Sequence, residues 1–154
     1  ELGVVKSAVE ANERQKQNMI EKIREGSGGL KGKTFAVLGL SFKPNTNDMR
    51  EAPSLFIIEN LLKEKAKIRA FDPVAMDDAG RLLGKKLHYA KDAYDCVKGA
   101  DAVIIVTEWN EFRNLELGRV RKLLKTPCFF DLRNIYEPGK MRKLGFQYFS
   151  VGRG

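Results

Sequence analysis

The chain has 154 residues, of which 43% are apolar and 31% are charged, and its 28 Lys and Arg outnumber its 20 Asp and Glu to give a formal net charge of +8. This length and apolar content predict one core of ordinary domain size. No apolar run approaches the roughly 20 residues that a bilayer-crossing helix needs, so a membrane span is excluded. The two cysteines, Cys96 and Cys128, lack the CxxC spacing of a metal or redox site and predict a reducing, cytoplasmic compartment with no metal centre.

The amino-terminal segment is predicted to be a long helix. The chain begins at Glu1 rather than Met, and its charged opening indicates a piece of a longer protein without a signal peptide. Residues 2–25 carry apolar side chains near helical spacing at both ends and a polar middle, so we expect one end to dock on another domain or subunit. The glycines at 26–29 predict the helix end and a hinge. The chain is therefore divided into a helix at 1–26, a Gly-rich linker at 27–32 and a folded domain at 33–154.

From Lys33 onward, short apolar runs alternate with amphipathic stretches. The predicted strands are 34–38, 67–71, 86–89, 102–106, 127–130 and 146–151. The predicted helices are 54–65, 76–83, 92–98, a longer one within 111–125, and 140–144. This alternation implies right-handed crossovers and helices on both faces of a parallel sheet. The predicted fold is α/β, a Rossmann-like doubly wound, mainly parallel sheet of five or six strands, preceded by a long helix.

The first predicted strand runs into the loop GLSFKPNTNDMREAPS, residues 39–54. A Rossmann cofactor site would place GxGxxG here, but only Gly39 is present. The acidic residue at the end of the second strand, Asp72, lies farther from that glycine than the usual roughly 20 positions. We therefore predict that this domain does not hold NAD in the standard manner.

The same loop is well supplied for binding anions. Lys43 and Arg50 flank a polar turn, and the N–H groups of the following helix are expected to point back toward them. Lys provides a point charge, Arg a planar fork suited to phosphate oxygens, and Phe42 an aromatic face for a base or sugar. The alternative is a solvent loop whose cations pair with Asp48 and Glu51.

The later strand ends also carry polar residues. Trp109 follows the fourth strand and is expected to be a packing anchor. Asp131 and Arg133 leave the buried fifth strand, where a charge must be paired or await a partner; an internal pair between the two is the alternative. The single histidine, His88, is expected at a core or edge position. No nucleophile, base and orienting group can be assembled, which indicates a binding domain.

Several ordered motifs resemble a known family. The segments VLGLSFKPNTNDMREAPS, IRAFDPVAM, ADAVIIVTEW, FFDLRNIY and GFQYFSVGR are similar to the carboxyl-terminal, UDP-binding domain of UDP-glucose 6-dehydrogenases, in the nucleotide-sugar dehydrogenase family. The resemblance covers Lys33 to Arg153, and the helix at 2–24 resembles the end of the family's long central helix, through which subunits pair. It implies an NAD-dependent enzyme that converts UDP-glucose to UDP-glucuronate by two oxidations at C6, with NAD bound mainly by an amino-terminal domain.

The resemblance also assigns residues. The pair Phe42 and Lys43 is expected to contact the UDP-sugar together with Arg133, and Arg50 is expected to reach the NAD pyrophosphate across the domain cleft. The family's catalytic Cys lies in a motif resembling GxxCFPKD, which this sequence lacks. We therefore expect no catalytic residue in this fragment and no activity from it alone. Two positions differ from the common family residues: Asn47 replaces Asp and Leu132 replaces Gly.

The implied partners are a UDP-sugar, the missing amino-terminal domain and a second subunit joined through the helix, with neither nucleic acid nor membrane. Two alternatives stay open: a GDP-mannose or UDP-N-acetylhexosamine dehydrogenase domain, and a non-enzymatic module that binds phosphate or nucleic acid. The basic clusters lack interleaved aromatic residues and are broken by acidic ones, which is typical of a solvated surface.

Overall fold

The computed structural model of the chain describes residues 2–50 and 52–152. The strands are β1 (Thr34–Leu38), β2 (Lys67–Phe71), β3 (His88–Tyr89), β4 (Ala102–Ile105), β5 (Cys128–Asp131) and β6 (Gln147–Ser150). The helices are α1 (Leu2–Ser27), α2 (Pro53–Lys63), α3 (Met76–Leu83), α4 (Ala93–Val97), α5 (Asn110–Arg113), α6 (Leu117–Leu123) and α7 (Pro138–Lys143). All six strands are parallel, in the order β3-β2-β1-β4-β5-β6. This order confirms the Rossmann-like fold.

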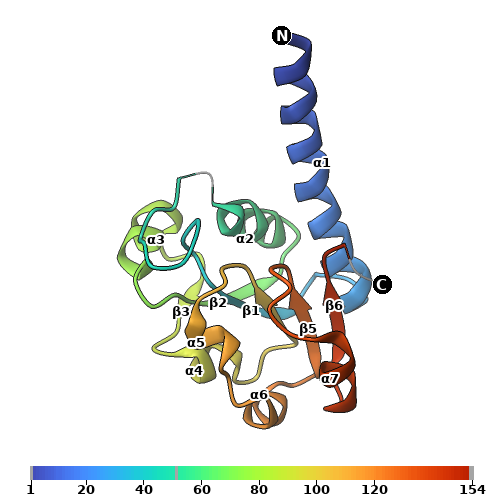
Figure 1. Cartoon of the computed structure of the whole chain (residues 1–154). Helices are drawn as coiled ribbons and strands as arrows, with labels where there is room; N and C mark the ends of the chain where they lie inside the picture. The colour runs from blue at the N-terminus through green and yellow to red at the C-terminus, as the bar shows by residue number, and fades with distance from the viewer. Residues whose placement is uncertain (1, 51, 153–154) are drawn as a thin grey trace.

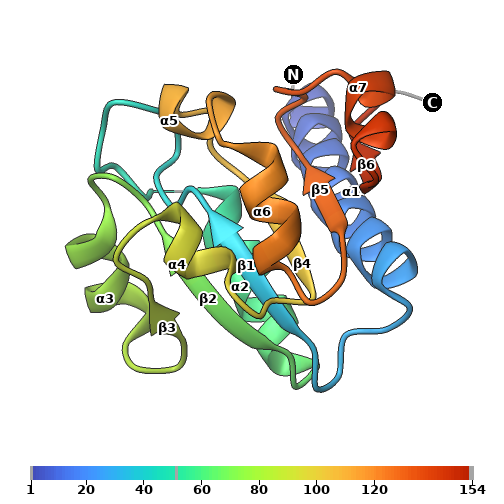
Figure 2. The same ribbon diagram turned by 90° about the horizontal axis from the view of Figure 1, so that it is seen from below.

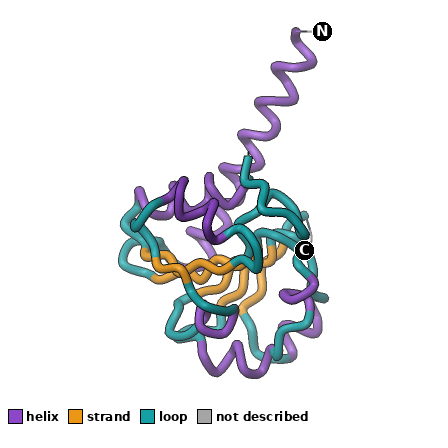
Figure 3. The backbone as a smooth tube through the Cα atoms, turned by 90° about the vertical axis from the view of Figure 1, so that its left-hand side faces the viewer, coloured by secondary structure: helices purple, strands orange, loops and turns teal. Residues whose placement is uncertain are grey.

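The sheet lies between two layers of helices (Figure 3). Successive side chains of a strand point to opposite faces, so each central strand contributes to two cores. In β1, Phe35 and Val37 pack with α1, α2 and α3, whereas Ala36 and Leu38 pack with α4, α5, α6 and α7. Figure 2 views the second layer, with α4 and α6 in front of the sheet. Burial on both faces explains why these strands are almost continuously apolar.

Helix α1 packs on the domain through its carboxyl-terminal half. Ile20 and Ile23 are buried in the core shared with α2, while the amino-terminal half of the helix extends beyond the domain (Figure 1). The helix ends in a glycine cap, because the N–H of Gly29 donates to the carbonyl of Arg24 at 2.9 Å and Gly28 adopts a positive φ of 69°. The glycines therefore end the helix as the sequence predicts.

Most elements differ from their predicted ranges by one or two residues at an end, and two differ more clearly. The segment 111–125 contains two short helices, α5 and α6, because the chain between them turns inward to bury Leu115 and the N–H of Glu116 donates to the Tyr94 hydroxyl at 3.0 Å. The third strand is limited to His88 and Tyr89, since it forms the edge of the sheet and pairs only with β2. His88 is exposed there, in agreement with an edge position.

Both cysteines are core side chains. Cys96 and Cys128 are buried on opposite faces of the sheet. Burial raises the pKa of the Cys128 thiol to about 11 and also raises the pKa of Cys96, because the thiolate loses hydration. Both thiols are therefore protonated at neutral pH. None of the helices in the described part of the chain is long and apolar enough to cross a bilayer.

Candidate functional site

The sheet has one topological switch point. From β1 the chain proceeds to β2 and β3 on one side, then returns to β4 on the other side, so the strand order reverses between β1 and β4. Ligands of open α/β sheets bind beyond the carboxyl ends of the strands at such a point. The segments placed there are the loop after β1, residues 39–52, and the turn after β4, residues 106–109.

These two segments are in close contact. Gly39 has a φ of 101°, and a Cβ added to it would lie 2.5 Å from the backbone nitrogen of Thr107. The Thr107 hydroxyl donates to the carbonyl of Ser41 at 2.7 Å. Only glycine combines this backbone angle with so close an approach, so the glycine that the sequence places after β1 serves backbone packing between two loops.

Asp72 organises the same edge from the end of β2. It is 1% exposed, and one carboxyl oxygen accepts from the amides of Leu40 and Ser41 at 2.8 and 3.1 Å and from the Trp109 indole at 3.2 Å. The other oxygen accepts from the two amides of Val74–Ala75 at 2.9 and 2.8 Å. Both oxygens are thus used by the protein itself.

The hydrogen bonds of Asp72 determine whether this domain can bind a dinucleotide in the standard Rossmann manner. In the standard Rossmann site an acidic residue at the end of the second strand binds the ribose, and the first turn opens toward the pyrophosphate. Here the Asp72 carboxylate is buried and accepts hydrogen bonds from backbone amides of the protein, and Gly39 packs against Thr107. The domain's own residues therefore do not fit NAD in that manner. Trp109, 8% exposed, anchors the network as expected.

The loop after β1 presents Phe42 and Lys43 to solvent on a fixed backbone. The amide of Phe42 donates to the carbonyl of Asp48 at 2.7 Å, and the Ser41 hydroxyl donates to the carbonyl of Lys43 at 2.9 Å. The Phe42 side chain is 49% exposed. Lys43 is exposed, and no carboxylate in the described part of the chain lies within ion-pair distance of it. An aromatic face and a cation thus stand side by side beyond the switch point.

Arg133 stands beyond the end of β5. The internal pair considered above does not form: buried Asp131 accepts from the backbone amide of Arg133 at 3.2 Å, from the Tyr136 amide at 2.9 Å and from the Tyr148 hydroxyl at 2.6 Å. Asp131 therefore shapes the turn, and Tyr136 and Tyr148 occupy its second oxygen. The Arg133 guanidinium pairs instead with Glu108, the residue after Thr107 beyond β4.

Sequence reasoning missed Glu108. The residue stands in the quoted segment ADAVIIVTEW, but only its neighbour Trp109 was singled out. Both Nε and Nη2 of Arg133 contact the same oxygen of Glu108. The available signal was position, because strands β4 and β5 are adjacent and their carboxyl ends bring an acidic and a basic residue to one edge.

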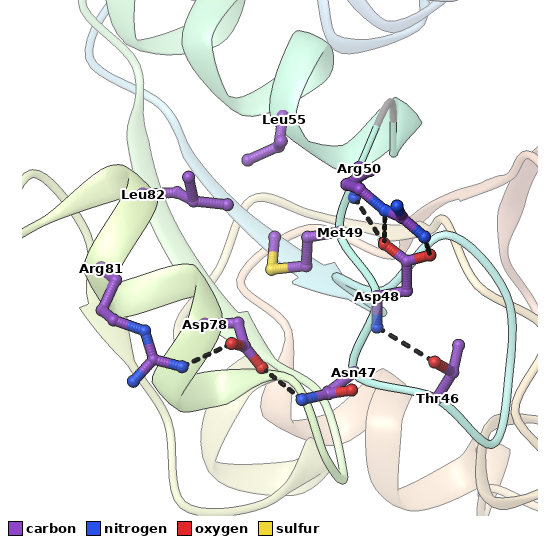
Figure 4. Close-up of a pocket in the computed structure, with 9 residues that line it drawn as sticks. All are labelled: Thr46, Asn47, Asp48, Met49, Arg50, Leu55, Asp78, Arg81 and Leu82. Atoms are coloured by element: carbon purple, nitrogen blue, oxygen red, sulfur yellow. Dashed lines mark hydrogen bonds and ion pairs between the residues drawn. The ribbon is translucent and has the colours of Figure 1, made fainter.

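Arg50 lies at a separate place. A hollow of about 860 Å³ opens between the loop after β1, α2 and α3 (Figure 4). Met49, Leu55 and Leu82 form its apolar part, and Arg50 and Arg81 stand at its sides. The other lining residues are Thr46, Asn47, Asp48 and Asp78. Phe42, Lys43 and Arg133 do not line this hollow.

Polar contacts hold the two sides of the hollow. Arg50 makes a bidentate pair with Asp48, with Nε–Oδ1 and Nη2–Oδ2 distances of 3.1 and 3.0 Å, so the pairing expected for a solvent loop forms for this arginine. Glu51, the other acid considered, lies outside the described residues. Asn47 donates to Asp78 on α3 at 2.9 Å, which ties the loop to that helix. The amide at position 47 therefore has a definite structural partner.

The Arg50 pair makes a testable contribution to the charge state of Asp48. Hydrogen bonds from Arg50 lower the pKa of Asp48 from its ordinary 3.8 to about 2. The pair therefore stabilises the folded chain above pH 3.8, and this contribution is lost as pH falls through about 2. In an Arg50→Ala variant we expect the pKa of Asp48 to rise toward 3.8, measured by NMR titration of the carboxyl carbon.

The matched control for this titration is Arg81→Ala. It removes the arginine on the other side of the hollow, which pairs with Asp78 rather than Asp48. The Asp48 pKa should be unchanged in this variant. An Asp48 pKa that stays near 2 in Arg50→Ala would contradict the assignment.

These residues together form a candidate binding edge. Phe42 and Lys43 follow β1, Arg133 follows β5, and the turn after β4 contacts both sides through Thr107 and Glu108. No cluster of three acidic, His or Cys side chains suited to a metal occurs in the described ranges. Cations and an aromatic ring at this edge of the sheet are typical of ligand-binding sites in Rossmann-like domains.

Comparison with known proteins identifies the family of this chain. Residues 36–138 match the UDP binding domain of the UDP-glucose/GDP-mannose dehydrogenase family, and the chain belongs to that family. It is 40% identical over 150 residues to UDP-glucose 6-dehydrogenase TuaD of Bacillus subtilis, covering 97% of this chain and 32% of that protein. It is 42% identical over 151 residues to UDP-glucose 6-dehydrogenase of Rhizobium meliloti, covering 97% of this chain and 34% of that protein.

Solved structures agree with this placement. A UDP-glucose dehydrogenase from Pyrobaculum islandicum superimposes with a TM-score of 0.82 at 28% identity, covering 100% of this chain and 33% of that one. A UDP-D-ManNAc dehydrogenase from Pyrococcus horikoshii gives 0.81 at 25% identity, covering 100% of this chain and 34% of that one. The chain spans about a third of the length of the curated relatives that it matches.

Proposed function

We propose that this chain is the nucleotide-binding part of an NAD-dependent UDP-glucose 6-dehydrogenase, which oxidises UDP-glucose twice at C6 to UDP-glucuronate. The observation that carries the proposal is the placement of Lys43 and Arg133 at the carboxyl edge of one sheet, on either side of the turn after β4. Membership of the family supports UDP as the nucleotide. In this proposal Phe42 contributes an aromatic surface to the UDP-sugar.

The chemistry of the ligand matches these residues. A diphosphate carries several oxygens whose charge is stabilised by cations approaching from different directions. Lys43 supplies a point charge from the β1 loop, and Arg133 supplies a planar donor group from the β5 end. The described thiols are buried and protonated, so this part of the protein contributes binding rather than chemistry at C6.

In the proposed enzyme this chain also contacts an amino-terminal domain and a second subunit. NAD is held mainly by an amino-terminal domain, and Arg50 reaches its pyrophosphate from the edge of the hollow. The projecting half of α1 pairs with the same helix of a second subunit to form a homodimer, as its extension beyond the domain suggests. The enzyme is cytoplasmic, and the isolated chain has no dehydrogenase activity.

A related substrate is the second candidate. The Pyrococcus horikoshii relative, at 25% identity, is a dehydrogenase of a UDP-N-acetylhexosamine, UDP-D-ManNAc, and the family model includes GDP-mannose dehydrogenases. The curated relatives at about 40% identity are UDP-glucose 6-dehydrogenases, which favours UDP-glucose. Titrations with UDP and with GDP test whether the site prefers uracil or guanine, because a UDP site should bind UDP more tightly.

The binding proposal is tested with the chain itself. UDP binding, measured by calorimetry or NMR, should be roughly tenfold weaker in the double variant Lys43→Ala, Arg133→Ala, because two charged contacts to phosphate are lost. The matched control Lys85→Ala, Lys86→Ala removes the same charge before β3, at the opposite edge of the sheet, and should bind like the parent chain. Equal affinity of the parent and the Lys43, Arg133 variant would refute the proposal.

A nucleic-acid-binding module gives a different result in the same assay. Single-stranded oligonucleotides would then bind with a steep salt dependence, and UDP would not displace them. For a UDP site, we expect UDP binding to persist in the presence of the oligonucleotide.

A further inference from the structure

Arg133, which is proposed to bind phosphate, already forms an ion pair with Glu108. Nε and Nη2 of Arg133 both contact one oxygen of Glu108, so the edge of the guanidinium that they form is occupied. The Arg133 side chain is 44% exposed and the Glu108 side chain 20% exposed. The pair therefore stands at the surface of the binding edge, where a ligand can reach it.

Arg133 has few other ways to satisfy its charge. The nearby Asp131 is buried, and its oxygens accept from the Arg133 amide, Tyr136 and Tyr148. Among the residues that the structure describes, no carboxylate other than Glu108 lies within ion-pair distance of the guanidinium. The hydrogen bonds to Asp131 fix the backbone of the turn, whereas the ion pair with Glu108 positions the Arg133 guanidinium.

We propose that Glu108 is a competing counter-ion for Arg133, which the diphosphate of the ligand displaces when it binds. The inference rests on the proposed role of Arg133 in binding UDP. Bidentate recognition of phosphate needs a pair of parallel N–H groups, and Glu108 occupies one such pair. A carboxylate left beside a diphosphate also repels it.

Two consequences follow for the site. Without ligand, Glu108 holds Arg133 at the carboxyl edge between β4 and β5 and neutralises its charge. With ligand, breaking this pair offsets part of the attraction between Arg133 and the phosphates, so Glu108 lowers the affinity for UDP. Glu108 acts through Arg133 and is therefore a positioning residue.

The test is a double-mutant cycle read by UDP affinity. Glu108→Gln keeps the shape of the side chain and removes its charge, and we expect UDP to bind roughly three- to tenfold more tightly, as loss of a partly exposed ion pair predicts. In the Arg133→Ala background the same change should alter the affinity less than about twofold. Glu111→Gln is the matched control, because Glu111 is an exposed residue of α5 that carries an equal charge three residues along the chain and makes no ion pair with Arg133.

The outcomes separate the two proposals. If the parent chain and Arg133→Ala bind UDP equally, the proposed site itself is wrong. If Arg133→Ala weakens binding but Glu108→Gln leaves it unchanged or weakens it, the site stands and competition by Glu108 is overturned. Equal tightening by Glu108→Gln with and without Arg133, or by Glu111→Gln, would also overturn it, since the effect would then be general electrostatics. Far-UV circular dichroism verifies that each variant is folded.

Discussion

Replacing Gly39 by alanine is expected to lower the free energy of unfolding by about 3 to 5 kcal/mol. At a φ of 101° an L residue is strained, and the new Cβ would lie 2.5 Å from both the backbone nitrogen and the Cβ of Thr107. The backbone of the neighbouring turn cannot yield as a flexible side chain would, so β1 and β4 must separate at the switch point. Urea denaturation followed by far-UV circular dichroism measures the loss.

Gly118→Ala makes the same chemical change at a permissive position. Gly118 lies in α6, its φ is not in the left-handed region, and no neighbouring atom lies within 4 Å of the added Cβ. We expect it to raise the free energy of unfolding by up to about 1 kcal/mol, since alanine is the better helix former. A Gly39→Ala chain as stable as the parent would show that the loops after β1 and β4 are not in close contact.

Asp72→Asn is expected to destabilise the chain by at least about 3 kcal/mol, although the two side chains have the same shape. Every hydrogen-bond partner of the Asp72 carboxylate is a donor, with three donors reaching one oxygen and two reaching the other. An asparagine must place its own NH₂ against one of these groups. Whichever way the amide is turned, buried donors face a donor.

The matched control is Asp77→Asn, an exposed acid in the first turn of α3. It should cost about 0.5 kcal/mol or less, the usual size of a charge interaction with a helix end. Trp109 reports on the network directly, because its indole donates to Asp72. We expect a changed tryptophan emission in folded Asp72→Asn and none in Asp77→Asn. An Asp72→Asn chain within about 1 kcal/mol of the parent would contradict the proposed role of the network.

The hydrogen bonds of buried Asp72 and Asp131 order the loops that carry the candidate binding residues before a ligand arrives. Asp72 and Asp131 are both buried, and each holds the backbone of a loop rather than a charged side chain. The residues that face solvent, Phe42, Lys43 and Arg133, are therefore carried on turns whose backbone is already ordered. Pre-ordering of this kind reduces the entropy lost on binding.

The order of elements followed from local patterns. Continuous apolar runs predicted β1, β4 and β5 within one residue of their ends, because a strand buried on both faces needs apolar side chains at every position. Two predictions were poorer. Edge strand β3 is shorter than expected, and the helix expected within 111–125 is divided where Leu115 turns inward.

The binding edge was predictable in part. Motif and strand position placed Phe42, Lys43, Arg50 and Arg133 beyond carboxyl ends of strands, and the structure has them there. It also separates Arg50, which lines the hollow beside α3, from the other three. Their roles in binding remain predictions for the titrations above.

By itself, the amino-acid sequence determined the alternating fold, the glycine at the end of β1 and the family, because each depends on residues close together in the chain or on their order. Only the tertiary structure decided which charges meet. Glu108 rather than Asp131 pairs with Arg133, and Asp72 binds Trp109, although these partners lie 25 and 37 residues apart. Such choices depend on which strand ends become neighbours and on where each side chain points, and no local periodicity encodes either.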